Sequence, residues 1–139
     1  MQTDGTGAIG GLGGSIGYGG MTHSVAVEFD TYRNPYDLDN NHVAAVAGGG
    51  SDIAQPGAAT SPTPLFGQLV HVRISYAPAG RMLSVQVRGN GEPWEHVLSR
   101  QVDLTATLGT RRAHVGFTAG TGASVSTQSI LNWTLDLRR

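Results

Sequence analysis

Residues 24–46 read SVAVEFDTYRNPYDLDNNHVAAV, and this stretch decides the fold. Its first part, VAVEFD at positions 25–30, alternates apolar residues with small or acidic ones. A period of two is typical of a β-strand, because successive side chains point to opposite faces of the sheet. One face of the predicted strand is therefore apolar, and the other carries the carboxylates of Glu28 and Asp30.

More side chains of the kind that bind metal ions follow within a short loop. Asn34 and Pro35 begin a turn, and Asp37 and His42 come after it. Carboxylates this close repel one another unless a positive charge lies between them. Carboxylates with an imidazole suit a transition ion such as manganese, and carboxylates with amide and carbonyl oxygens suit calcium. A solvated acidic turn with a surface histidine is the alternative, but the combination in strand register favours a metal site.

The stretch resembles the metal-binding segment of the legume-type (L-type) lectins, including the bacterial members of that superfamily. The family pattern is Val-Ala-Val-Glu-Phe-Asp-Thr followed by Tyr or Phe, a variable residue, Asn, a short loop, Asp and then His, and all of it is present. The resemblance implies an all-β, concanavalin A-like β-sandwich (jelly roll) that holds Ca²⁺ together with Mn²⁺ or another transition metal. By matching position, the implied metal ligands are Glu28, Asp30, Tyr32 through its backbone carbonyl, Asn34, Asp37 and His42.

A glycine-rich segment, residues 1–20, precedes the metal strand and reads MQTDGTGAIGGLGGSIGYGG. Such a composition usually forms a flexible linker, but interspersed apolar residues such as Ile9 favour a packed segment. The resemblance supports packing, because bacterial L-type lectins carry a similar run whose backbone approaches the bound sugar where no Cβ obstructs it. It implies sugar contacts from Gly19 and Gly20. A phosphate-binding loop is disfavoured, because no Gly-Lys-Ser/Thr motif is present.

The chain after the metal loop reads as further strands. HVRISYA at 71–77 and MLSVQVR at 82–88 both alternate, and a Pro-Ala-Gly turn joins them into a predicted hairpin. WEHVLSRQVDL at 94–104 is predicted as the next strand, with Trp94 in the core or at its rim.

Two later segments also resemble the family. AHVGFTAGTG at 113–122 is similar to a family strand and loop, so we expect Val115 and Phe117 in the core. SILNWTLDLRR at 129–139 resembles the last strand of the sandwich, which predicts a core position for Trp133. The implied carbohydrate-binding residues are Gly19, Gly20, Tyr32, Asn34, Thr121, Gly122 and Ala123.

The composition fits one all-β domain of 139 residues, with 21 glycines and only 14% charged residues. A net charge of −1 leaves no basic excess for binding phosphates, so nucleic acid is excluded as a partner. The absence of cysteine excludes disulfides. No apolar run is long enough to insert into a bilayer, and no signal pattern is present. We expect a secreted or cell-surface protein whose signal lies outside this chain.

The predicted function is reversible binding of glycans or glycoconjugates, without catalysis. A structural adhesin-type module that binds metal without sugar is one alternative. A glucanase-like hydrolase is another, but its Glu-x-Asp-x-x-Glu motif is broken by Arg33. Complete L-type lectin domains have more strands before the glycine loop, so residues 1–139 are expected to be the C-terminal portion of one. The sheet edges bared in such a portion predict a homo-oligomer.

Overall fold

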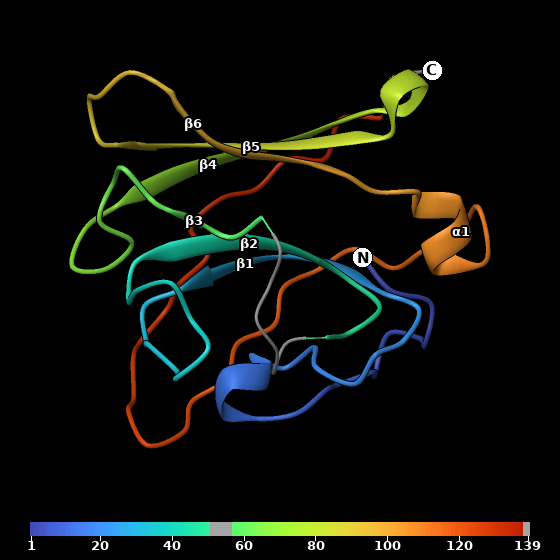
Figure 1. The fold of residues 1–139 in the computed structure, drawn as a ribbon, viewed down its shortest axis with the longest axis horizontal. Helices are drawn as coiled ribbons and strands as arrows, with labels where there is room; N and C mark the ends of the chain where they lie inside the picture. The colour runs from blue at the N-terminus through green and yellow to red at the C-terminus, as the bar shows by residue number, and fades with distance from the viewer. Residues whose placement is uncertain (51–56, 138–139) are drawn as a thin grey trace.

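The computed structural model describes residues 1–50 and 57–137, and within them the fold is almost entirely antiparallel β-structure (Figure 1). This part of the chain contains two three-stranded sheets, with β2 and β5 as the central strands. The first sheet consists of β1 (Val25–Asp30), β2 (His42–Ala47) and β3 (Ala59–Thr60). The second consists of β4 (Val70–Ala77), β5 (Met82–Gly89) and β6 (Glu95–Gln101).

The apolar faces of the two sheets pack against each other and form the main core. Val25 and Val43 of the first sheet belong to one cluster with Leu83 and Val85 of the second. Burying a side chain of this size contributes about 1.5–3 kcal/mol. Figure 1 shows the sheets as two stacked layers. The period-two prediction is confirmed for β1 and β5, whose alternate apolar residues reach this core. It holds only in part for β4, the edge strand of its sheet, because Tyr76 packs against the core but Val72 and Ile74 are 42% and 50% exposed.

The other face of the first sheet is covered by the glycine-rich segment. Tyr18 packs there against Ala44 in a second apolar cluster. The segment contains the short 3₁₀ turn η1 (Gly13–Ser15), and the backbone N–H of Gly10 donates to the carbonyl of Gly17 over 2.8 Å. A Cβ added at Gly10 would lie 2.5 Å from the backbone carbon of Tyr18, so only glycine fits. The segment is packed, as predicted, but through Tyr18 and Ile16 and not through Ile9, which is 77% exposed.

The strand predicted at 94–104 is shorter than expected, because β6 ends before Asp103. The side chain of Asp103 accepts a hydrogen bond from the N–H of Ala106 over 3.0 Å and caps α1 (Leu104–Leu108). The Pro-Ala-Gly turn between β4 and β5 forms the 3₁₀ turn η2 (Pro78–Gly80). In the described ranges, no helix has both the length and the apolar character that crossing a membrane requires.

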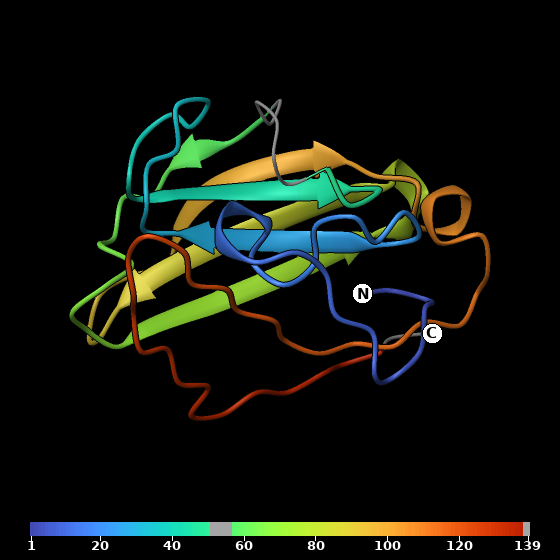
Figure 2. The same ribbon diagram turned by 90° about the horizontal axis from the view of Figure 1, so that it is seen from below.

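Residues 115–137 form no strand, so the two strands predicted in this region are wrong. Phe117 and Trp133 contact each other edge to face, with ring centroids 5.7 Å apart. Their side chains are 58% and 55% exposed and that of Val115 is 40% exposed, so the predicted core positions are wrong as well. A β-strand requires a neighbouring strand that hydrogen-bonds to its backbone N–H and C=O groups. Within the described residues, no strand pairs with residues 115–137. Figure 2 shows this segment running beside the two sheets.

Candidate functional site

Three of the predicted metal ligands meet at one end of the first sheet. Asp30, the last residue of β1, pairs directly with His42, the first residue of β2. Paired residues on neighbouring strands project from the same face of the sheet. The loop that joins the two strands places Asp37 beside Asp30 and His42. One ligand atom from each residue lies within 4.8 Å of the other two. Two carboxylates and an imidazole at this spacing have the donor chemistry of a divalent-ion site.

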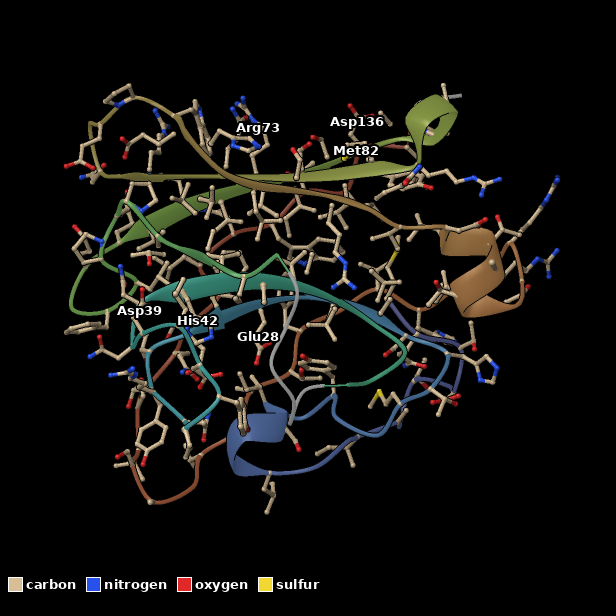
Figure 3. All side chains as sticks on the ribbon, viewed as in Figure 1. Glu28, Asp39, His42, Arg73, Met82 and Asp136 are labelled. Carbon is tan, nitrogen blue, oxygen red and sulfur yellow. The ribbon has the colours of Figure 1, made fainter. Side chains whose placement is uncertain are left out.

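The ring of His42 is held in one orientation by the loop that precedes it (Figure 3). Its Nδ1 lies 2.8 Å from the backbone carbonyl oxygen of Asp39, which can only accept a hydrogen bond. In the neutral ring Nδ1 therefore carries the proton, and the lone pair lies on Nε2. Nε2 faces Asp37, 3.8 Å from its Oδ1. In metal sites, a histidine ligand commonly donates its other ring N–H to a backbone carbonyl, and this hydrogen bond orients the ring.

Asp39 is absent from the predicted ligand set, yet it organises this loop. Its carboxylate accepts hydrogen bonds from the hydroxyl of Thr60 and from the N–H of Asn41. Burial by itself would raise the pKa of Asp39, but these hydrogen bonds and the nearby His42 outweigh it, and the pKa is lowered. The sequence signal is the run Asp39-Asn40-Asn41, because such side chains bond the backbone two residues further on.

The two clustered carboxylates are partly satisfied by the loop. Asp30 accepts from the N–H of Tyr32 over 2.7 Å, and Asp37 accepts from the backbone and side-chain N–H groups of Asn34 over 2.6 and 2.8 Å. Burial raises the pKa of Asp30; the Tyr32 hydrogen bond and His42 lower it in part, and the charge of Asp37 raises it. Without a cation, the site therefore disfavours ionisation of Asp30.

Glu28 does not join this group of three ligand atoms. It lies on the same face of β1 as Asp30, at the next outward position along the strand (Figure 3). The side chain is buried, and its Oε2 accepts a hydrogen bond from the hydroxyl of Tyr18 over 3.1 Å. The structure thus brings three of the six predicted metal ligands together and holds Glu28 against the glycine-rich segment.

Tyr32 and Asn34, which are predicted both as metal ligands and as sugar contacts, lie on the same loop. Tyr32 is 47% exposed, so its ring is available at the surface. Asn34 lies against the glycine-rich segment, where a Cβ added at Gly14 would come within 3.3 Å of its amide and 2.8 Å of the Tyr36 hydroxyl. Sequence reasoning missed Gly14, because the signal for it is a contact between segments and not a local pattern.

The loop after residue 117 meets the glycine-rich segment from the other side. The N–H of Gly13 donates to the carbonyl of Thr121 over 3.2 Å, and a Cβ at Gly122 would lie 3.2 Å from the Cα of Gly13. The hydroxyl of Thr118 donates to the carbonyl of Ile16 over 2.8 Å. Three segments far apart in sequence therefore converge around Gly13 and Gly14, and they bring together three of the predicted sugar-contacting residues, Asn34, Thr121 and Gly122.

The remaining predicted sugar contacts lie around this convergence. The N–H groups of Gly19 and Gly20 donate to the carbonyls of Ser15 and Gly49, both over 2.9 Å. These donors are used within the fold, so a sugar contact from either glycine stays a prediction. Ala123 is exposed on the loop that carries Thr121, and its role likewise stays a prediction.

Comparison with known proteins gives three kinds of match. The legume lectin domain matches residues 16–139. Probable L-type lectin-domain containing receptor kinase I.2 of Arabidopsis thaliana is 34% identical over 129 residues, which cover 85% of this chain and 19% of that protein. The bark lectin of Styphnolobium japonicum is 33% identical over 132 residues, covering 91% of this chain and 46% of that protein. A solved structure of peanut lectin with a 9mer peptide superposes with a TM-score of 0.56 at 30% identity, covering 75% of this chain and 44% of that one.

These matches bear on both the fold and the family. The likeness to peanut lectin confirms the predicted concanavalin A-like fold. The chain spans less than half the length of each of these relatives. Because the match to the legume lectin domain extends over most of its residues, the chain belongs to the legume lectin domain family.

Proposed function

We propose that this chain binds carbohydrate reversibly and without catalysis, in a manner that depends on divalent ions. The observation that carries the proposal is the group formed by Asp30, Asp37 and His42, whose ligand atoms lie within 4.8 Å of one another. Asp37 is hydrogen-bonded to Asn34, the loop residue that also touches the glycine-rich segment. Membership of the legume lectin domain family supports carbohydrate as the ligand.

The donor set suggests which ions this site would hold. The Nε2 of His42 together with the two clustered carboxylates suits a transition ion such as Mn²⁺. The same carboxylates with the Asn34 side-chain oxygen and the Tyr32 carbonyl suit Ca²⁺, which prefers oxygen ligands. Bound ions would supply the positive charge that lets both carboxylates stay ionised in a buried place.

The loop residues themselves would contact the sugar. The exposed Tyr32 ring offers a flat apolar surface on which a pyranose can stack at low entropy cost. Asn34 stands beside it with a polar amide, and the missing Cβ at Gly14 leaves room for close approach. A shallow site of this kind binds single sugars weakly, so we propose that several sites act together in a homo-oligomer.

A glycan array probed with and without EDTA tests the proposal. We expect binding by the wild-type chain with Ca²⁺ and Mn²⁺ present, loss of that binding in EDTA, and its recovery when the ions return. Asn34→Ala should abolish binding while the far-UV circular dichroism stays unchanged. Retained binding in Asn34→Ala, or binding that EDTA leaves intact, would count against the proposal.

The same array separates the two alternative functions. A hydrolase would release sugar products, but the motif that such a site needs has Arg33 in place of its second glutamate. A structural module would bind the ions and leave every glycan unbound. We also propose that the protein acts outside the cell, either secreted or at the cell surface, where glycoconjugates are displayed. Because residues 1–20 resemble the glycine run of bacterial L-type lectins, we propose that the chain is a bacterial member of the family.

A further inference from the structure

Two arginines lie together on the outer face of the second sheet, away from the metal loop. On β5, Leu83, Val85 and Val87 are buried, so the alternate residues of this strand point away from the core. Arg88 is one of them and pairs with His71 of β4.

Arg73 occupies the next outward position on β4. It pairs with Gln86 of β5, which is two residues before Arg88. The two arginines are therefore diagonal neighbours on one face, and Figure 3 shows Arg73 on the outer side of the sheet.

Trp94 holds these two arginines close to each other. The guanidinium carbon of Arg73 lies 4.2 Å from the centre of the indole ring, and that of Arg88 lies 4.8 Å from it. A guanidinium stacked on an aromatic face is attracted to it by the negative charge of the ring face. The Trp94 ring thus holds the two positively charged guanidinium groups near each other although they repel.

Neither guanidinium is neutralised by the rest of the described chain. No carboxylate in residues 1–50 and 57–137 forms an ion pair with Arg73 or Arg88, whereas Arg81 pairs with Asp103 over 2.8 Å. The Nε of Arg88 is buried without a hydrogen-bond acceptor. The nearby Glu92 carboxylate accepts from the N–H of Gly89 instead.

The rest of this face is rich in groups that can donate hydrogen bonds. His96 of β6 pairs with Gln86, in the same row of the sheet as Arg73. Its Nε2 lies 2.9 Å from the hydroxyl oxygen of Ser99, which in turn lies 2.8 Å from that of Ser84. The face thus presents two fixed cations beside further polar groups, although the whole chain has a net charge of −1.

We propose that Arg73, Arg88 and Trp94 form a second binding site, which takes a sulfate or carboxylate group carried on a saccharide and needs no divalent ion. Guanidinium groups match the geometry of planar or tetrahedral oxyanions because they donate two parallel hydrogen bonds. A saccharide is the carrier that suits a member of a lectin family. The site is separate from the metal loop, so the proposal stands even if the loop binds no sugar.

Titration of a heparin-derived hexasaccharide into the protein in EDTA tests the proposal. The chain has two tryptophans, so Trp133→Phe leaves Trp94 as the sole reporter, and its fluorescence should change on binding. Arg73→Gln with Arg88→Gln should weaken binding by about tenfold or more, because two charge-assisted hydrogen-bond donors are lost. Arg73→Lys with Arg88→Lys keeps the charge but loses the paired donors and should also weaken binding. Thermal unfolding of each variant establishes that it is folded.

The matched control is the double variant Arg111→Gln with Arg112→Gln, which removes two exposed charges after α1. Its affinity for the hexasaccharide should stay within about twofold of wild type, because these charges lie outside the proposed site. An equal loss in this control would mean non-specific attraction and would overturn the proposal. So would the absence of hexasaccharide binding, or binding that disappears in EDTA. Inorganic sulfate should compete only at much higher concentration, and equal potency would overturn the assignment of a saccharide ligand.

Discussion

Gly14 is the residue at which the glycine-rich segment touches the candidate sugar loop. A Cβ there would lie 2.8 Å from the Tyr36 hydroxyl and 3.3 Å from the Asn34 amide. Gly14→Ala should therefore displace the Tyr36 hydroxyl and the Asn34 amide and weaken glycan binding several-fold. Gly7→Ala is the matched control, because a Cβ at Gly7 meets nothing within 4 Å. Glycan titrations of both variants check this, and equal affinities would contradict it.

The pKa of Asp30 predicts how stability responds to pH. Burial raises this pKa above the unfolded value of 3.8, with opposing contributions from Tyr32 and His42. Ionised Asp30 thus destabilises the ion-free fold at neutral pH, and this penalty disappears as the pH falls through the folded pKa. Urea unfolding in EDTA should find Asp30→Asn more stable than wild type at pH 7, with the difference shrinking on acidification. A difference that grows as the pH falls would contradict this assignment.

The residue types of the metal site could be predicted, but the contacts between segments could not. The period of two places Asp30 on the polar face of β1, and the short loop limits how far Asp37 and His42 can lie from it. The hydrogen bond from Tyr18 to Glu28 and the approach of Gly14 to Asn34 join segments distant in sequence. No local pattern encodes such contacts.

At the scale of elements, the core between the two sheets should dominate stability. Leu83 on β5 is 5% exposed within the main cluster, whereas its neighbour Met82 is 37% exposed. Leu83→Ala should lower the free energy of unfolding by about 2–5 kcal/mol, because it leaves a cavity. Met82→Ala should cost less. Urea unfolding of both variants measures the difference, and comparable losses would contradict this description of the core.

The strands were predictable where a neighbour in the chain supplies the pairing. Alternation was enough to find β1 and the hairpin of β4 and β5. It cannot find β2, whose residues His42–Ala47 do not alternate and which pairs with β1 across one loop. Residues 130–137 alternate in the same way without becoming a strand, because no strand pairs with them in the described structure. The short helix α1 was missed because its five residues are too few to establish a helical period, although Leu104 and Leu108 stand at helical spacing.

At the scale of the whole molecule, exposed apolar side chains predict self-association. Ile74 on the edge strand β4 is 50% exposed, and Trp133 is 55% exposed. An unpaired edge strand and apolar surface of this kind favour contact with another chain. Sedimentation velocity should show concentration-dependent association that Ile74→Lys with Trp133→Ser reduces. Ile9→Lys is the control, since Ile9 is 77% exposed on the glycine-rich segment. A monomer at all concentrations would contradict the prediction.

Calorimetric titration of Mn²⁺ and then Ca²⁺ into EDTA-treated protein is the most direct test of the central claim, which is that paired carboxylates and one imidazole hold divalent ions. Wild type and the exposed-histidine control His23→Gln should bind both ions saturably. His42→Gln should bind Mn²⁺ at least about 10–100-fold more weakly, because losing only a hydrogen-bond partner of a metal ligand already costs that much. Absence of ion binding in wild type, or equal Mn²⁺ affinity in His42→Gln, would contradict the account.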